Sequence, residues 1–197
     1  MANVSEGLVI VKGVLCDIGE CKDKDVVVPE EVTSVGDKAL LKCSKIKSVT
    51  FLGCVTSIGV SAFSECKNLE SVTFLGEAKE EEVYSKNSAA PSPEEKSAEK
   101  SVGVIIPGVI KKISGRAFSG CKKIGSVTFG DGVKVIGPEA FLGCTKLKRV
   151  IIPEGVDRIE QYAFAQCKSL KVAVVPNSVK NIGNYAFDYN VVKITRV

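Results

Sequence analysis

The chain has 197 residues, of which 45% are hydrophobic and 25% charged, and its net charge is +4 at pH 7. This composition supports one soluble domain with its own core, and no apolar run approaches the roughly 18 residues that a membrane-spanning helix needs. Histidine is absent, which removes the commonest general base and metal ligand near neutral pH and argues against many classes of enzyme and metal site.

Residues 1–25 do not follow the repeat pattern that begins after them. Two apolar runs, Leu8–Val11 and Val14–Ile18, predict short strands that form an N-terminal cap, because terminal units of repeat proteins are atypical where their outer side meets water. The segment lacks a basic signal-peptide region, and Lys12 interrupts its apolar stretch. We therefore expect a cytoplasmic location, with a secreted or surface location as the alternative if a signal has been removed.

From residue 26 onward, a motif with a small alanine recurs along the chain. The alanine stands at Ala39, Ala62, Ala117, Ala140, Ala163 and Ala186, and four of the five intervals are 23 residues, whereas the fifth is 55. A fixed period in the twenties indicates a solenoid. Large apolar residues recur seven and four positions before the alanine, and one and seven positions after it. We expect these residues to point inward and to stack from turn to turn as one core.

Each repeat also carries a three-residue apolar run that predicts a strand. The runs are 26–28, 49–51, 72–74, 104–106, 127–129, 150–152 and 173–175. Because side chains alternate along a strand, the outer two of each run point into the core and the middle one points out. The runs predict a parallel concave sheet of about seven short strands, roughly 30 Å long. The few residues from alanine to cysteine predict turns or single helical turns on the convex side. A glycine after the second apolar position, as at Gly59 and Gly137, indicates a turn or a close backbone approach.

Residues 76–103 interrupt the pattern. They are rich in Glu, Lys, Ser, Ala and Pro and poor in large apolar residues, a composition that does not offset the entropy of ordering. We expect an inserted, disordered surface loop with the strands on either side still adjacent. The alternative is a repeat that has been replaced and lengthened. Repeats then resume over 104–190, and 191–197 predict a final edge strand.

Five of the eight cysteines occupy one repeat position, four residues after the alanine: Cys43, Cys66, Cys121, Cys144 and Cys167. We interpret them as a ladder of small buried side chains. Disulfides between them are not expected, because equivalent side chains point the same way, and a linear ladder lacks the tetrahedral arrangement of a zinc site. Cys16 and Cys21 are the pair for which a bond stays open.

The pattern V-x-x-I-G-x-x-A-F-x-x-C-x-x-L-x-x-V-x-I/F-P strongly resembles the BspA-like, or Treponema-type, leucine-rich repeat family. Its clearest copies are 133–153 and 156–176, and the resemblance covers about residues 26–75 and 104–190. The resemblance implies one β-rich leucine-rich-repeat solenoid over 1–197 with its main sheet on the concave side. It also implies a protein-interaction role, often at a microbial surface, and it provides no catalytic or cofactor residues.

The middle residues of the runs form the candidate partner-binding surface on the concave face. They are Val27, Thr50, Thr73, Ile105, Thr128, Ile151 and Val174. Ile105, Ile151 and Val174 are the predicted anchors, since an exposed apolar patch tends to mark a partner site. Arg149 and Lys171 are expected to flank them, and an apolar centre with a basic edge suits a protein partner. The alternative is that a terminal arm or another subunit covers these residues.

Charge is unevenly distributed, because residues 104–197 hold 15 basic and 6 acidic residues. A nucleic acid or another acidic surface is therefore an alternative partner. We regard nucleic acid as the weaker alternative, because the phenylalanines occupy inward positions and are not available for stacking. No constellation of nucleophile and base emerges from the repeats. We predict a non-enzymatic module without cofactor or metal that binds another protein or a second copy of itself, with a surface adhesin as the alternative.

Overall fold

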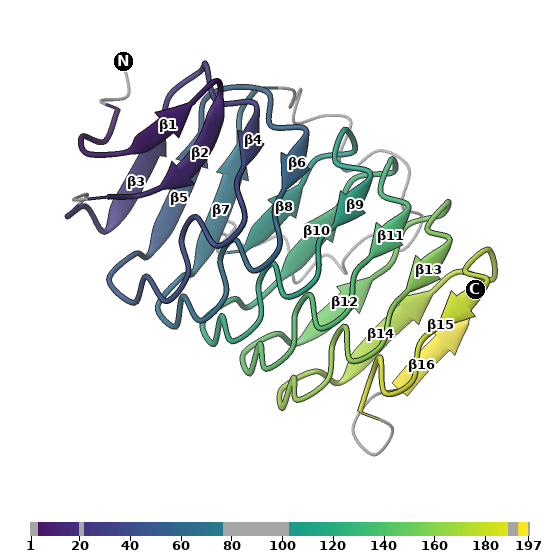
Figure 1. Ribbon diagram of the computed structural model, residues 1–197. Coiled ribbons are helices and arrows are strands. Elements are labelled where there is room, and N and C mark those ends of the chain that lie inside the picture. The colour runs from purple at the N-terminus through teal and green to yellow at the C-terminus, as the bar shows by residue number, and fades with distance from the viewer. Residues whose placement is uncertain (1–3, 20–21, 77–102, 189–192, 197) are drawn as a thin grey trace, which may run out of the picture.

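A computed structural model describes residues 4–19, 22–76, 103–188 and 193–196. The described chain winds through two layers of strands that lie face to face along the length of the molecule (Figure 1). Each layer is a sheet of eight strands, and no α-helix occurs in the described ranges. The predicted solenoid is confirmed, and the segments from alanine to cysteine are turns.

Sheet B contains the predicted runs and is parallel throughout. Its strands are β3 (Asp25–Val28), β5 (Ser48–Phe51), β7 (Ser71–Phe74), β8 (Val104–Ile106), β10 (Val127–Phe129), β12 (Arg149–Ile151), β14 (Val172–Val175) and β16 (Lys193–Arg196). The alternation of side chains is as predicted, since the burial of β8 and β10 runs buried, half-buried, buried. The sheet has one strand more than the predicted seven because β16 pairs with β14.

Sheet A was predicted only in its first two strands, which the N-terminal runs Leu8–Val11 and Val14–Ile18 indicated, because its other strands contain two residues each. Its strands are β1 (Val9–Val11), β2 (Val14–Asp17), β4 (Ser34–Val35), β6 (Ser57–Ile58), β9 (Lys112–Ile113), β11 (Val135–Ile136), β13 (Arg158–Ile159) and β15 (Asn181–Ile182). A two-residue strand is too short for alternation to reveal it. β1 and β2 form an antiparallel hairpin that continues the sheet, since β2 pairs with β4 in parallel.

The core lies between the sheets and is built from the predicted inward positions. Its centre is a ladder formed by Phe63, Phe118, Phe141, Phe164 and Phe187, each at most 1% exposed. Successive rings lie 5.0–5.3 Å apart between centroids and are nearly parallel. Offset stacking at this separation is favourable beyond the burial of apolar area. The ladder therefore ties each turn to the next.

Around the repeat alanine the chain makes tight turns that repeat in register. In the turn that leads into the alanine, Ala62 donates to the carbonyl of Gly59 (3.3 Å), and Ser61, the second of the two residues between them, has a φ of 57°. A positive φ at the third residue is the feature of a type II turn. The repeat glycines themselves do not have positive φ; instead a Cβ at Gly137 would lie 2.5 Å from the carbonyl oxygen of Ile113. Of the two roles predicted for these glycines, close approach is therefore the one observed.

The two sheets accommodate the long interval between Ala62 and Ala117 in different ways. In sheet B, Val72 of β7 pairs with Val104 of β8, so the strands on either side of the interruption are neighbours, as expected. In sheet A, β6 pairs directly with β9. Sheet B therefore gains a strand at this point, whereas sheet A continues without one in the described residues. The expected disordered loop itself lies within 77–102, which are outside the described residues.

Candidate functional site

The candidate site is the outer face of sheet B, and we keep this name for the surface formed by the middle residues of its strands. Parallel register places these residues in one row, with Thr50 opposite Thr73 and Thr128 opposite Ile105. Ile151 lies opposite Val174 in the same way. All of them are half-buried, because neighbours in adjacent strands cover part of each side chain.

The predicted anchors Ile105, Ile151 and Val174 therefore lie in one row, with Thr128 between the two isoleucines. Strands in a sheet are about 4.8 Å apart, so the row offers methyl groups at regular intervals. Its N-terminal part, with Thr50 and Thr73, is polar. Apart from Val27 in β3, the apolar part of the row lies in β8, β12 and β14.

The predicted basic residues lie beside the apolar part of this row. Arg149 is exposed and stands two residues before Ile151 in β12, so both side chains project from the same face. Lys171 is also exposed and directly precedes β14. The structure thus brings together aliphatic side chains and two cations, the arrangement expected for a polypeptide partner.

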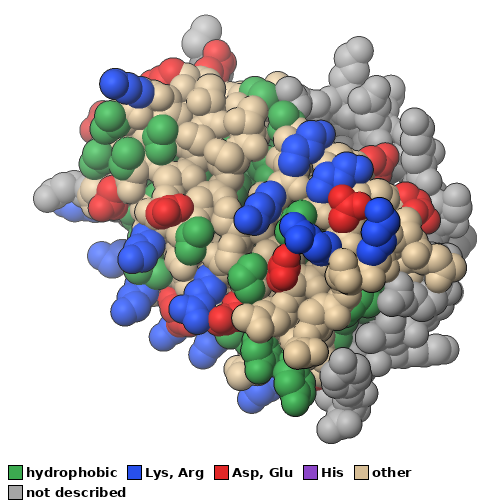
Figure 2. Space-filling model, turned by 45° about the vertical axis from the view of Figure 1, so that its right-hand side comes forward, with side chains coloured by type: hydrophobic (Ala, Val, Ile, Leu, Met, Phe, Trp, Pro, Cys, Tyr) green, Lys and Arg blue, Asp and Glu red, His purple; other side chains and the backbone are tan. Residues whose placement is uncertain are grey.

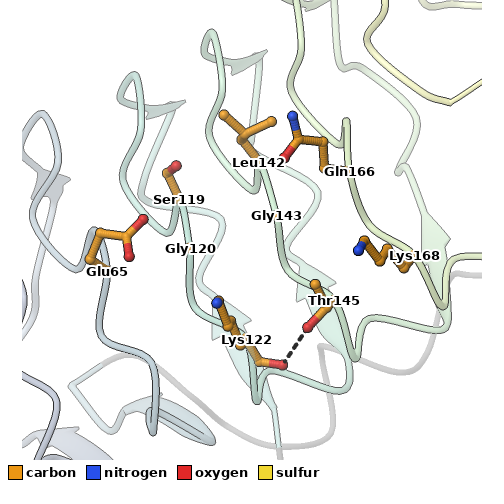
Figure 3. Close-up of a pocket in the computed structure, with 9 residues that line it drawn as sticks. All are labelled: Glu65, Ser119, Gly120, Lys122, Leu142, Gly143, Thr145, Gln166 and Lys168. Carbon is orange, nitrogen blue, oxygen red and sulfur yellow. Dashed lines mark hydrogen bonds between the residues drawn. The ribbon is translucent and has the colours of Figure 1, made fainter.

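A shallow polar hollow of about 260 Å³ lies beside these residues, on the turns that contain the repeat cysteines (Figure 3). Its lining comes from equivalent positions in successive turns, including Glu65, Lys122 and Lys168. The Glu65 carboxylate packs over the α-carbon of Gly120, and Thr145 donates a hydrogen bond to the Lys122 carbonyl (3.3 Å). No hydrogen-bonded nucleophile–base pair occurs among the lining residues that the structure describes. The hollow offers cations and a carboxylate to a polar surface ligand.

Sequence reasoning missed an exposed pair of tyrosines at the opposite corner of the repeat. Tyr162 and Tyr185 stack at 5.5 Å between centroids and are 40% and 58% exposed. Each directly precedes a repeat alanine, at a position where Arg116 and Glu139 form a bidentate pair of 2.9 Å in the two preceding turns. Tyrosine at this position in two successive repeats was the available signal.

The cysteine ladder is structural in four of its five positions. Cys66, Cys121, Cys144 and Cys167 are buried, and each thiol donates to a carbonyl oxygen of the preceding turn. Burial raises the pKa of the Cys121 and Cys144 thiols above the ordinary range and that of Cys167 to about 12. These thiols are therefore protonated and unreactive near neutral pH.

Cys43, in the first turn, departs from the prediction because it is half-buried. The neighbouring Cys66 side chain lowers the pKa of Cys43, against the opposing effects of burial and of the Asp17 carboxylate. The interaction with Cys43, followed by burial, raises the pKa of Cys66. Cys21 lies outside the described residues, so the predicted possibility of a Cys16–Cys21 bond stays open.

Two further searches of the described residues concern metals and membranes. No group of three or more His, Cys, Asp or Glu side chains that could hold a metal ion occurs in the described part of the chain. Within the same ranges, no helix has the length and hydropathy needed to cross a membrane.

The two-layered β-solenoid of 23-residue turns defines a leucine-rich-repeat protein. The sequence matches the BspA type leucine rich repeat region in six copies, over residues 19–88 and 97–197. The chain belongs to this family, as its repeat pattern predicted. Members are typically interaction or surface proteins and typically non-enzymatic. No curated protein matches the sequence.

Solved structures of bacterial leucine-rich-repeat proteins share the fold. The Treponema pallidum protein is 19% identical, with a TM-score of 0.61 over 93% of this chain and 76% of that one. The Bacteroides ovatus protein is 22% identical, with a TM-score of 0.63 over 89% of this chain and 43% of that one. The Eubacterium ventriosum protein is 21% identical, with a TM-score of 0.64 over 94% and 48%. The chain therefore spans less than half of the last two proteins.

Proposed function

We propose that this chain is a non-enzymatic interaction module that binds a protein partner through the outer face of sheet B. The observation that carries the proposal is the row of half-buried aliphatic side chains with cations at its edge. Ile105, Ile151 and Val174 act as anchors, and Arg149 and Lys171 set the orientation of the partner through its carboxylates.

The regular spacing of the row supports an extended partner. Each strand contributes one outward side chain about 4.8 Å from the next, so a partner chain that crosses the strands meets a new side chain at each step. Because each strand contributes one side chain to the row, binding energy is expected to come from several modest contacts. Half-buried methyl groups are well suited to this, since most of their ordering already occurs on folding.

The proposal is tested with a triple variant, Ile105→Asp, Ile151→Asp and Val174→Asp. A matched control carries Leu41→Asp, Val60→Asp and Val135→Asp, which replace exposed or half-buried aliphatic residues outside the outer face of sheet B. Far-UV circular dichroism establishes that both variants fold.

Affinity capture from the native organism, with mass spectrometry, identifies proteins retained by the wild type. Each is then purified and titrated against the three chains by calorimetry, and sedimentation velocity examines self-association in the same way. We expect the face variant to lose binding at least about a hundredfold, because it places charges in a desolvated contact. Binding that is equally strong in both variants contradicts the proposal.

A further inference from the structure

The excess of positive charge in the C-terminal half gathers at one edge of the fold. The stretches that lead from each cysteine turn into sheet B, residues 122–126, 145–149 and 168–172, contain seven basic residues and no acidic one. They are Lys122, Lys123, Lys146, Lys148, Arg149, Lys168 and Lys171. We call this set the basic edge.

The members of the basic edge are neighbours across turns. Lys171 donates its backbone N–H to the carbonyl of Lys148 (3.0 Å), and Lys148 donates to that of Gly125 (3.3 Å). Register then places Arg149 beside Val172. Because adjacent turns are about 4.8 Å apart, the three stretches form one continuous band of cations.

Little negative charge compensates this band. Lys123 lies 3.6 Å from Glu70, whereas the other six cations take part in none of the ion pairs found among the described residues. These six side chains are exposed. Elsewhere on the surface the signs mix: in Figure 2 a group of Lys and Arg side chains right of the centre has acidic side chains among it. An uncompensated band attracts anions more strongly than a mixed surface does.

The basic edge is bordered by two features that a partner can use. On one side lies the polar hollow, whose lining includes Lys122 and Lys168. On the other side lies the apolar part of the outer face of sheet B, because Arg149 and Ile151 project from the same face of β12. Cations and aliphatic side chains therefore belong to one continuous surface.

We propose that the basic edge binds an acidic polypeptide segment, whose carboxylates meet the lysines while its apolar side chains contact Ile151 and Val174. The inference rests on the proposed function, because it gives the chemistry of the partner at the same face. An extended peptide places alternate side chains on opposite sides, so one chain can direct acidic residues to the edge and apolar residues to the row.

Other polyanions fit this surface less well. Single-stranded nucleic acids gain affinity by stacking bases on aromatic side chains, and the three stretches contain no Phe, Tyr or Trp. A sulfated polysaccharide has no apolar side chains to occupy the aliphatic row. The cations are six lysines and one arginine, and lysine recognises a carboxylate as a point charge without demanding bidentate geometry.

The test uses the full chain and two fluorescein-labelled probes, poly-L-glutamate and a glutamate peptide of equal charge with spaced leucines. The basic-edge variant carries Lys146→Gln, Lys148→Gln, Lys168→Gln and Lys171→Gln. The control carries Lys111→Gln, Lys112→Gln, Lys134→Gln and Lys180→Gln, which are exposed and remove the same charge elsewhere. A third variant, Ile105→Thr, Ile151→Thr and Val174→Thr, introduces the residue that other turns carry in the same row.

Fluorescence anisotropy titrations give the affinities. We expect the basic-edge variant to bind both probes at least about tenfold more weakly than the control variant does, with wild-type binding that weakens as salt rises. The leucine peptide should bind the wild type more tightly than poly-L-glutamate. Equal losses in the basic-edge and control variants overturn the proposal, because they show that net charge alone attracts the probes.

The remaining arms separate the proposals from each other. If the threonine variant binds the leucine peptide no more tightly than poly-L-glutamate, the outer face of sheet B contributes to binding as proposed. If the leucine peptide still binds the threonine variant more tightly than poly-L-glutamate does, the proposed role of the outer face of sheet B is wrong. The proposed role of the basic edge is then judged by the poly-L-glutamate titrations alone. Heparin or a single-stranded oligonucleotide that binds more tightly than the leucine peptide at equal charge concentration overturns the assignment to a polypeptide.

Discussion

Replacing Phe141 by leucine tests whether the phenylalanine ladder holds successive turns together. The Phe141 ring stacks on Phe118 and Phe164, both at 5.3 Å, and meets Phe129 edge-on at 5.9 Å. Leucine keeps most of the apolar volume, so the swap itself costs less than about 1.5 kcal/mol. Each lost ring contact adds about 0.5–1.5 kcal/mol. We therefore expect the free energy of unfolding to fall by about 1.5–6 kcal/mol.

Phe187, at the end of the ladder, provides the matched comparison. Its ring stacks on Phe164 at 5.2 Å, and this is its one ring contact among the described residues. With one contact to lose, Phe187→Leu should cost about 0.5–3 kcal/mol. The difference between the two variants reports the contribution of ring contacts, because the chemical change is the same in both.

A double-mutant cycle measures the contact directly. Phe118 and Phe141 touch, so their leucine variants should show a coupling energy of about 0.5–1.5 kcal/mol. Phe118 and Phe187 are three turns apart and should be additive within about 0.5 kcal/mol. Guanidinium unfolding followed by far-UV circular dichroism gives both values, provided that each transition is single and the m-value is constant. A coupling between Phe118 and Phe141 no larger than that between the distant pair would refute the reasoning.

Three further predictions concern backbone contacts and thiols. Gly137→Ala should lower the denaturant midpoint more than Gly143→Ala does. A Cβ at residue 137 meets a backbone oxygen at 2.5 Å, whereas at residue 143 the nearest atoms are at 4.0 Å and only the positive φ costs about 1–2 kcal/mol. Equal midpoints in the two variants contradict this prediction. The neighbouring Cys66 side chain lowers the pKa of Cys43, so iodoacetamide should label Cys43 at lower pH than it labels an unperturbed cysteine, and Cys66→Ala should shift this labelling to higher pH. Burial raises the pKa of Cys144, so iodoacetamide should label Cys144 in denaturant and not in the native state. Native-state labelling of Cys144 as fast as that of Cys43 would show that solvent reaches the buried cysteines.

The sequence predicted the solenoid because its period is carried by residues whose burial is fixed by repetition. The alanine, the large apolar residue after it and the outer residues of the apolar runs recur at fixed spacing, and these residues are buried as predicted. Stacking similar units requires the same residue type at the same position of each repeat, so the core residues can be identified from the sequence. The inner and outer sides of sheet B follow from alternation within each run.

Features that depend on short elements or on neighbours across turns were not visible in the sequence. Sheet A consists mostly of two-residue strands, which have no period of their own. Cys43 shares a repeat position with Cys66, yet it is half-buried, whereas Cys66 is buried. The repeat position of Cys43 is evident from the sequence, whereas the burial of its side chain depends on the neighbouring turn.

The candidate site was predicted in part. The middle residues of the runs were correctly placed in one outward row, because alternation alone determines which side chains leave the core. Their partial burial, which adjacent strands produce, was not predicted. The charge asymmetry was known as a property of the C-terminal half, and its concentration in one band appears when residues 23 apart are brought side by side.

By itself, the sequence determined the architecture, the buried ladders and the outward row, since all three follow from local periodicity. The tertiary structure alone decided that β6 pairs with β9, because hydrogen bonds over a 55-residue separation are set by the closing of the core. It also decided that Lys122, Lys148 and Lys171 form one surface. Such residues are distant along the chain, and winding the chain into turns about 4.8 Å apart makes them neighbours.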